Sequence, residues 1–418
     1  MAQRASPSPE PEPPPESRQF SEFLGALASG LVAGASDNDP TSVATLAIIG
    51  ASFIYDLNWL VLLVLPMLLV IQIVSARIGM VTRSNVVEAV RDNFGKTWAL
   101  VAMVTVLVVN LFTIGADLEG GAAAAGLMLN LPWQWFVVPL ALFQGGLLIF
   151  GNYSQVSRIL RYLVLVFVAY IFAAILARPD WHLVIYRTLV PVVRLDKAFV
   201  AAILALLGTT LTSYVYVWVS IEAEEEHRPL SQLHVVEVDA AAGITMTVVL
   251  FWFIVVATGA TLGVRHDTVN TAQDAAQALE PIAGRFAGLM FALGLLASAL
   301  LAIPILAATS AYVMSAAFAW NGSLNQPIGW ATIPFYAVLV GSLAIGAALT
   351  LFEIDPIQLL FLAGIVAGIG TPLLLVFLLL LGGSRRVMGQ YRVGGFLQIT
   401  GWLSAAIVSV ASIVYLIQ

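Results

Sequence analysis

The chain has no cysteine, only four histidines and few charged side chains, since Asp, Glu, Lys and Arg make up 10% of its 418 residues. Without cysteine there is no disulfide, iron–sulfur cluster or thiolate metal site, and the redox compartment is left open. Roughly a quarter of the residues of a soluble domain are charged, so this composition argues against that class. All the histidines fall in polar connecting segments, at His182, His227, His234 and His266. We therefore expect no imidazole at membrane depth.

Apolar residues are abundant instead: 60% of the chain is hydrophobic and the mean hydropathy is +0.95. Stretches of about 20 apolar residues, enough to cross a bilayer as a helix, recur along nearly the whole chain. This pattern predicts an all-α polytopic protein embedded in the lipid bilayer of the cell inner (plasma) membrane. The net charge of −6 and the lack of a basic stripe argue against a nucleic-acid partner.

Eleven hydrophobic segments are expected, and three of them exceed the length of a straight span, so they tilt, break or continue outside the bilayer. The segments cover residues 22–51, 58–77, 98–129, 133–151, 157–177, 198–221, 238–264, 283–318, 329–352, 355–382 and 394–417. An odd total indicates two five-helix repeats, the second inverted, plus one extra helix. The repeats would cover residues 21–178 and 197–382, and the extra helix 394–417.

The first 20 residues are rich in Pro, Glu and Ser and lack an apolar core, so they are expected to be a disordered tail and not a signal peptide. Residues 21–418 would form a single transmembrane domain. The loops after segments two, four and ten are basic, which predicts a cytoplasmic N-terminus and an external C-terminus. These loops hold Arg77, Arg83, Arg91, Lys96, Arg158, Arg161, Arg385, Arg386 and Arg392. The connection at 178–197 is also basic, but this orientation makes it external, so it does not follow the charge rule.

Two segments carry interruptions that an ordinary span has no reason to carry. The stretch 36–42, Ser-Asp-Asn-Asp-Pro-Thr-Ser, puts two carboxylates and a proline inside the first segment. Ionisable groups at bilayer depth are costly and usually face a cavity or pathway, and proline frees backbone carbonyls. The stretch 208–214, Gly-Thr-Thr-Leu-Thr-Ser-Tyr, interrupts the sixth segment at the corresponding place in the second repeat. Such paired irregular segments indicate the binding site of a transporter.

The two breaks offer oxygen donors alone, as a hard cation requires. The candidate metal ligands are Asp39, Asp37, Ser42, Thr209 and Thr212, with Thr41, Ser213 and freed carbonyls as further donors. Asp37 has an alternative role as a cap of the second half-helix. No Cys, His or Met lies at either break, which disfavours Fe, Cu and Zn and leaves Mg²⁺, Ca²⁺, Mn²⁺ or Na⁺.

Other carboxylates have two readings each. Asp117 and Glu119 in segment three either relay protons or lie in a solvated external end of the helix. Glu222 and the glutamates at 224–226 form a solvated helix end in one interpretation. In the other, one of them pairs with loop arginines as an inner gate.

The two interruptions resemble motifs of the NRAMP family of divalent-metal transporters. The family's first-helix motif is Asp-Pro-Gly-Asn; Asp39 and Pro40 match it, and Thr41 and Ser42 replace the last two residues. The sixth-helix motif is Gly-Ala-Thr-x-Met-Pro-His; Gly208 and Thr210 match it, and Thr212, Ser213 and Tyr214 replace Met, Pro and His. Weaker matches follow in the family's order at 75–82, 117–118, 354–357 and 384–389.

The resemblance covers nearly the whole hydrophobic chain and implies a LeuT-type fold with alternating access. The family's metal-binding glutamine of the tenth helix falls at Gly364, so Gly364 and Thr212 are expected to enlarge the pocket for a hydrated ion. Loss of the methionine resembles the divergent branch of the family, some of whose members carry Mg²⁺. Tyr214 replaces a histidine linked to proton handling, which leaves strict proton coupling in doubt.

The resulting hypothesis is an alternating-access transporter that moves a hard divalent cation, Mg²⁺ before Mn²⁺, into the cytoplasm as a monomer and without a cofactor. Asp39 would be the charged ligand, and Asp117, Glu119, Tyr214 and Glu222 are the candidate proton or gating residues. The second hypothesis keeps the fold but moves a non-metal solute, with Na⁺ or H⁺ at Asp39. A membrane enzyme is disfavoured because the membrane segments offer no histidine or cysteine to serve as base or nucleophile.

Overall fold

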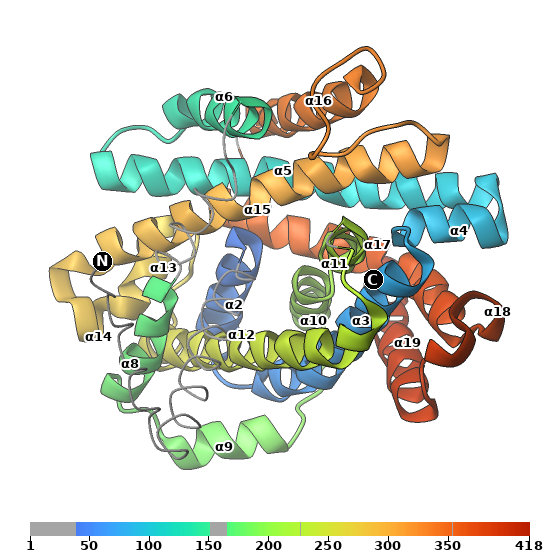
Figure 1. The fold of residues 1–418 in the computed structure, drawn as a ribbon. Helices are drawn as coiled ribbons and strands as arrows, with labels where there is room; N and C mark the ends of the chain where they lie inside the picture. Colours follow the sequence, from blue (N-terminus) through green and yellow to red (C-terminus); the bar gives the residue numbers. More distant parts are fainter. Residues whose placement is uncertain (1–38, 151–164, 226, 353) are drawn as a thin grey trace, which may run out of the picture.

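The computed structural model describes residues 39–150, 165–225, 227–352 and 354–418, and within them the chain is helical, with no β-strand. The helices form one bundle in which α5 (Lys96–Leu129) and α15 (Ala287–Phe318) lie side by side (Figure 1). The short helices α6 (Gln134–Phe150) and α16 (Ile333–Leu349) pack on the outer side of this pair (Figure 1). The expectations for the tail, for residues 22–38 and for residues 157–164 lie outside the described residues.

Long apolar helices occupy eight of the eleven predicted segments. Within the described residues, eight helical stretches are long and apolar enough to cross a bilayer, α6 and α2 (Pro40–Phe53) are shorter apolar helices, and the described part of segment 157–177 contains the short helix α8 (Ala169–Leu176). The remaining long helices are α3 (Asn58–Thr82), α10 (Lys197–Thr210) with α11 (Ser213–Glu225), α12 (Leu233–Thr261), α17 (Pro356–Gly383) and α19 (Gly395–Ile417). The expectation that all histidines lie in connections is wrong for His234, which is the second residue of α12.

Among the described residues, four connections contain short helices. These are α4 (Val86–Phe94) before α5, α9 (Trp181–Leu189) before α10, α13 (Ala272–Ala276) with α14 (Glu280–Ala283) before α15, and α18 (Arg385–Met388) before α19. The connection around α9 is the one that disagrees with the charge rule, because the predicted orientation makes it external. Asp56, in the turn between α2 and α3, forms ion pairs with Arg187 and Arg194 of this connection. Two of its four basic side chains therefore share one local carboxylate, which balances one of their charges.

Helix α2 begins where the first interruption predicted a break. Asp39 is the N-cap, with an extended backbone (φ −76°, ψ 162°), and Pro40 is the first helical residue. Proline suits this position because its missing N–H would have had no intrahelical partner there. The carboxylate of Asp39 compensates by accepting a hydrogen bond from the backbone N–H of Ser42.

The sixth segment is broken as predicted. Helix α10 ends at Thr210, and α11 starts three residues later at Ser213, which leaves Leu211 and Thr212 outside either helix. The last carbonyls of an α-helix have no intrahelical donor, so this interruption exposes acceptors in the middle of the bundle. The hydroxyl of Thr371 on α17 donates to one of them, the carbonyl of Leu211, at 3.3 Å.

Helices α10 and α17 cross with their backbones in contact. A Cβ atom on Gly208 would clash with the carbonyl oxygen of Gly364 and would lie 2.7 Å from Cα of Gly368. A Cβ on Gly364 would lie 3.0 Å from the carbonyl oxygen of Ala205. The expectation that Gly364 enlarges the pocket is therefore wrong, because the main chain of α10 already fills the space beside it.

Helices α5 and α15 are longer than a bilayer span, as expected, and both continue without a break. Helix α5 has 34 residues and α15 has 32, each uninterrupted. At 1.5 Å per residue they are about 50 Å long, well beyond the roughly 30 Å hydrocarbon core. Their ends therefore reach the two opposite surfaces of the bundle, and α5 links the two cavities described below.

Candidate metal site

The centre of the site is Asp39, which is 3% exposed. Its Oδ1 accepts a hydrogen bond from the backbone N–H of Ser42 at 2.7 Å. Its Oδ2 accepts one from the hydroxyl of Tyr214, at the start of α11, at 3.0 Å. The two broken helices thus meet at this carboxylate, as the sequence predicted.

A second buried carboxylate, Asp117 of α5, lies within electrostatic range of the first. It is 0% exposed. Its Oδ1 accepts a hydrogen bond from the hydroxyl of Thr41 at 2.8 Å, and its Oδ2 has no hydrogen-bond partner. Within the described ranges no Lys or Arg pairs with Asp39 or Asp117. The solvated alternative for Asp117 is therefore wrong, since α15, α17 and α2 pack around this part of α5.

Hydroxyl groups surround the carboxylates. Ser42 and Thr209 share a hydrogen bond of 2.9 Å between their side-chain oxygens, which ties α2 directly to α10. The side-chain oxygens of Thr45, Thr212 and Ser213 are buried without a hydrogen-bond partner. A buried polar group without a partner is costly, so these oxygens fit a role as ligands. The donor set consists of carboxylates and hydroxyls, which suits a hard cation.

A small cavity of about 10 Å³ opens beside the break. Its polar lining consists of Ser42, Gln72, Thr209, Thr210, Tyr214 and Thr247. Such a volume accommodates about one water molecule. The expected room for a hydrated ion is thus absent from this conformation, because Tyr214 and the helix crossing at Gly364 fill the space.

Two residues of this lining were missed in the sequence. Gln72 of α3 is only 6% exposed, and it makes no hydrogen bond among the residues that the structure describes. Thr247 of α12 lies opposite. The amide of Gln72 inside an apolar segment was a signal that sequence reasoning could have used. Thr247 gave no such signal, because a lone threonine in an apolar helix is common.

Glu119 lies on α5, two residues after Asp117, and it does not contact Asp39. Its side chain is 0% exposed, and neither carboxylate oxygen has a hydrogen-bond partner. The expected solvated end is therefore wrong for Glu119 as well. Its charged neighbour is Asp355, at the N-terminus of α17. Asp355 is exposed and lines a cavity of about 380 Å³ at the C-terminal end of α5.

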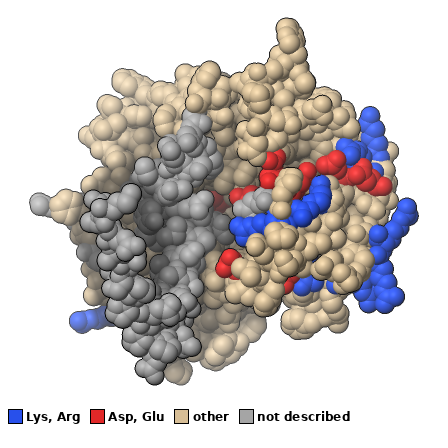
Figure 2. Space-filling view, viewed as in Figure 1, with Lys and Arg blue, Asp and Glu red and all other residues tan. Residues whose placement is uncertain are grey.

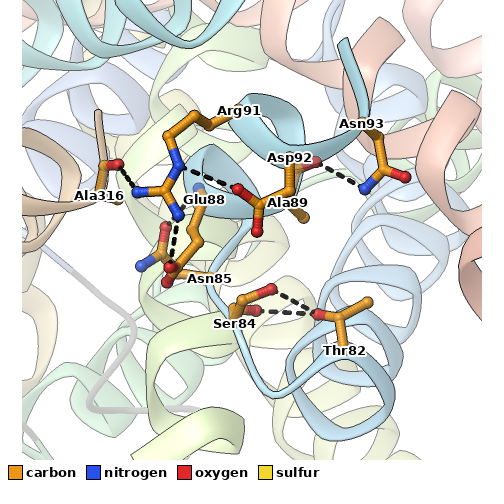
Figure 3. Close-up of polar contacts among 9 residues, drawn as sticks. All are labelled: Thr82, Ser84, Asn85, Glu88, Ala89, Arg91, Asp92, Asn93 and Ala316. Carbon is orange, nitrogen blue, oxygen red and sulfur yellow. Dashed lines mark hydrogen bonds and ion pairs between the residues drawn. The ribbon is translucent and has the colours of Figure 1, made fainter. Parts of the chain in front are cut away.

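A larger cavity, of about 610 Å³, lies at the other end of α5. Its carboxylates are Glu88, Glu224 and Glu225. Helix α4 forms one wall through Arg91, which bonds to Glu88 at 2.8 Å, to Asp92 at 2.9 Å and to the carbonyl of Ala316 (Figure 3). Burial alone would lower the pKa of Arg91, but the hydrogen bonds that it donates to Asp92 and Glu88 raise this pKa above its ordinary value, so the guanidinium stays charged.

Glu225, at the end of α11, is one of the glutamates predicted there. Its carboxylate accepts hydrogen bonds from Tyr312 at 2.9 Å, from Ser323 at 2.6 Å and from Asn325. These donors belong to α15 and the connection that follows it. Glu222 lies on the exposed side of α11 and takes no part in these bonds.

The structure thus brings together Asp39, Ser42, Thr209, Tyr214 and, through Thr41, Asp117. Thr212 lies at the interruption without a hydrogen bond, and Asp37 lies outside the described residues. Glu119 and Glu222 lie away from this centre. Among the described residues no three His, Asp or Glu side chains cluster closely enough to hold a metal, so any cation here depends on hydroxyls, carbonyls or amides.

Two interrupted helices that meet at a buried carboxylate, within a bundle of membrane-spanning helices, define a multi-pass membrane protein of the LeuT-type fold. The model of the family "Nramp: Natural resistance-associated macrophage protein-like" matches residues 30–418, and the chain belongs to this family. The resemblance seen in the sequence is therefore confirmed.

Curated relatives match over nearly the full length. The chain is 23% identical over 405 residues to the divalent metal cation transporter MntH of Caldanaerobacter subterraneus subsp. tengcongensis, covering 94% of this chain and 92% of the relative. It is 25% identical over 401 residues to MntH of Deinococcus radiodurans, covering 94% and 88%.

Solved structures confirm the fold. The manganese transporter of Eremococcus coleocola, in complex with an aromatic bis-isothiourea compound, superposes with a TM-score of 0.71 at 18% identity, covering 96% of this chain and 88% of that one. Mhp1, a nucleobase-cation-symport-1 family transporter in a closed conformation, superposes with a TM-score of 0.61 at 15% identity, covering 93% and 91%. The predicted LeuT-type fold is thereby confirmed.

Proposed function

We propose that this protein is a transporter that moves a hard divalent cation across the membrane by alternating access. The observation that carries the proposal is the pair Asp39 and Asp117, two buried carboxylates without a basic partner among the described residues. Two negative charges at bilayer depth are costly unless a cation or protons compensate them. A divalent cation at this point balances both charges at once.

The donor set favours Mg²⁺, with Mn²⁺ next. Carboxylates, hydroxyls and the amide of Gln72 are oxygen donors, and Mg²⁺ binds through such groups while it keeps part of its water shell. The curated relatives are named as divalent metal cation transporters and the Eremococcus coleocola protein as a manganese transporter, which supports a divalent substrate. Thr212 lies at the break where the family motif has a methionine. The absence of this soft donor supports a substrate ion that is harder than the ions of these relatives.

The two larger cavities supply the access routes of this proposal. The cavity beside Asp355, the charged neighbour of Glu119, lies at the C-terminal end of α5, and the cavity beside Glu225 lies between α4, the end of α11 and the C-terminal end of α15. Helices α4 and α18 carry basic residues on the same side of the bundle, where Figure 2 shows Lys and Arg gathered (Figures 1 and 2). Their position supports a cytoplasmic location for that side.

Transport inward needs no second ion in this proposal. The membrane potential contributes about 2.3 kcal/mol per charge per 100 mV, so a divalent cation gains roughly twice that amount on entry. Glu225, held by Tyr312, Ser323 and Asn325, closes the cytoplasmic side as the inner gate. One chain contains both interrupted helices, so a monomer suffices.

Flux into proteoliposomes tests this function. Uptake of Mg²⁺, Mn²⁺ and Ca²⁺ would be compared while a pH-sensitive dye reports the internal pH. We expect Mg²⁺ uptake without acidification, its loss in Asp39→Asn, and normal uptake in the control Asp239→Asn, which removes an exposed carboxylate of α12. Uptake of Mn²⁺ with acidification and without Mg²⁺ would contradict both the ion preference and the uncoupled mechanism.

A second candidate is a transporter of a non-metal solute, with Na⁺ or H⁺ held at Asp39. The neutral lining of the small cavity, where Gln72 and Thr247 face Thr209, favours this alternative. Calorimetric titration separates the two candidates. Heat with Mg²⁺ or Mn²⁺ that disappears in Asp39→Asn supports the cation transporter, and no heat with either ion supports the solute transporter.

A further inference from the structure

We propose that the hydroxyl of Tyr214 is a built-in competitor for the cation, which makes Tyr214 a specificity-determining residue of the site. This inference rests on the proposed function and adds how the same site selects its ion. The hydroxyl occupies Oδ2 of Asp39 at 3.0 Å, while the backbone N–H of Ser42 occupies Oδ1 at 2.7 Å. Both carboxylate oxygens are therefore engaged by donors of the protein itself.

The position of Tyr214 relative to the small cavity supports this role. Tyr214 lines the 10 Å³ cavity together with Ser42 and Thr209, and Asp39 does not. Tyr214 thus contacts both the carboxylate of Asp39 and this cavity. A cation in this cavity reaches Oδ2 of Asp39 only when the phenol hydroxyl moves away.

The competition explains a preference for divalent ions. A hydrogen bond to a charged acceptor is worth about a factor of ten or more in an equilibrium constant. Every cation must offset this loss to bind Asp39. A divalent ion gains twice the attraction of a monovalent ion from Asp39 and Asp117 at the same distance, so it offsets the loss more easily. The tyrosine therefore disfavours Na⁺ and K⁺ more than Mg²⁺ or Mn²⁺.

Tyr214 also connects the site to the inner gate. It is the second residue of α11, whose last residue is Glu225. Eleven residues of α-helix span about 16 Å. The bond from Tyr214 to Asp39 and the bond from Tyr312 to Glu225 therefore lie at the two ends of the same helix.

Calorimetric titration of the detergent-purified full chain with MgCl₂ tests the inference. Tyr214→Phe removes the hydroxyl and keeps the ring, and we expect about tenfold tighter Mg²⁺ binding. We also expect Na⁺ at high concentration to weaken Mg²⁺ binding to this variant more than to the wild type. The matched control is Tyr216→Phe, which removes another buried hydroxyl of α11, one that faces the carbonyl of Thr371 at 3.5 Å.

Each outcome decides the matter. Tighter Mg²⁺ binding in Tyr214→Phe and unchanged binding in Tyr216→Phe supports the inference, and unchanged or weaker binding in Tyr214→Phe overturns it. If the wild type binds Mg²⁺ and Asp39→Asn abolishes the binding, the proposed function stands whichever result Tyr214→Phe gives. If neither the wild type nor Tyr214→Phe binds, both proposals fail. Tyr214→Leu also lacks the hydroxyl donor, so its Mg²⁺ affinity must change in the same direction. This second variant tests the inference if the Tyr214→Phe protein misfolds.

Discussion

Thr41, the second residue of α2, donates a hydrogen bond of 2.8 Å to Asp117 in the middle of α5, 76 positions along the chain. This bond holds the second carboxylate beside the first. It also explains why a threonine follows Pro40 at this point, since its hydroxyl reaches α5 whereas the backbone N–H of the neighbouring Ser42 turns to Asp39.

The first prediction concerns the charge of this pair. Asp117→Asn removes one of the two negative charges, and we expect Mg²⁺ binding to weaken by at least about tenfold, since each buried charge near the ion contributes several kcal/mol at low effective dielectric. Calorimetric titration measures the change. Thr41→Val, which removes the hydrogen bond and keeps the charge, serves as the comparison and should weaken binding less. Equal affinities for the wild type and Asp117→Asn would show that Asp117 takes no part in the site.

The second prediction concerns the contact between α10 and α17. Gly208→Ala adds a methyl group that clashes with the main chain of Gly364 and Gly368, so we expect destabilisation by about 3 kcal/mol or more, or no folded protein. Size-exclusion chromatography and thermal unfolding in detergent measure the effect.

The control for this prediction is Gly146→Ala on α6. A Cβ at Gly146 meets nothing within 4 Å. Alanine is the better helix former, so this variant should be neutral or more stable by up to about 1 kcal/mol. A Gly208→Ala protein as stable as the Gly146→Ala protein would mean that the two backbones are not in contact.

The third prediction concerns the inner gate. Tyr312→Phe removes a donor of Glu225, so we expect the cavity at this end to open more often. The chain has no cysteine, so a single cysteine at Ala316→Cys, a buried position that lines this cavity, reports access through its labelling rate. We expect labelling several-fold faster in the Tyr312→Phe background, because a hydrogen bond to a charged group is worth about 1.5–3 kcal/mol.

Tyr336→Phe is the matched control for the gate. Its hydroxyl bonds to the carbonyl of Gln326, in the same connection between α15 and α16, and not to Glu225. Labelling should stay at the parent rate in this variant. Equal acceleration in both variants would assign the effect to the connection as a whole and not to Glu225.

The fourth prediction concerns Glu119. Its buried carboxylate makes no hydrogen bond, so replacement by the apolar Glu119→Met removes an uncompensated polar group and should raise stability by about 1–3 kcal/mol. Thermal unfolding in detergent measures this change. The exposed neighbour Asp355→Asn should change stability by less than about 0.5 kcal/mol. A less stable Glu119→Met protein would reveal that the carboxylate has a compensating partner in the folded protein.

Much of the fold was readable from local signals. The start of α2 at Pro40 and the interruption at Leu211 and Thr212 followed from residues that break a helix wherever they occur. The spans followed from the length of apolar runs, and the family from motifs around Asp39 and Gly208. These signals act over a few neighbouring residues, so no knowledge of the packing was needed.

The site was less predictable, as three residues show. Gly364 was expected to open the pocket, yet the main chain beside Ala205 closes it. Gln72 was not singled out, although it faces the cavity from α3. Glu225 was one of four neighbouring glutamates, and the partners that distinguish it lie on α15 and beyond, about 90 residues away along the chain.

The order of residues alone therefore established the membrane class, the helices, the two interruptions and the carboxylate between them, because hydropathy and helix breaking are local properties. The packing of α5, α11 and α17 against α2 decided that Asp117 lies near Asp39 and that the hydroxyl of Tyr214 bonds to Asp39. It also decided the volume of the cavity beside them. These relations depend on distances between segments far apart in the chain, and only the folded arrangement of the helices determines such distances.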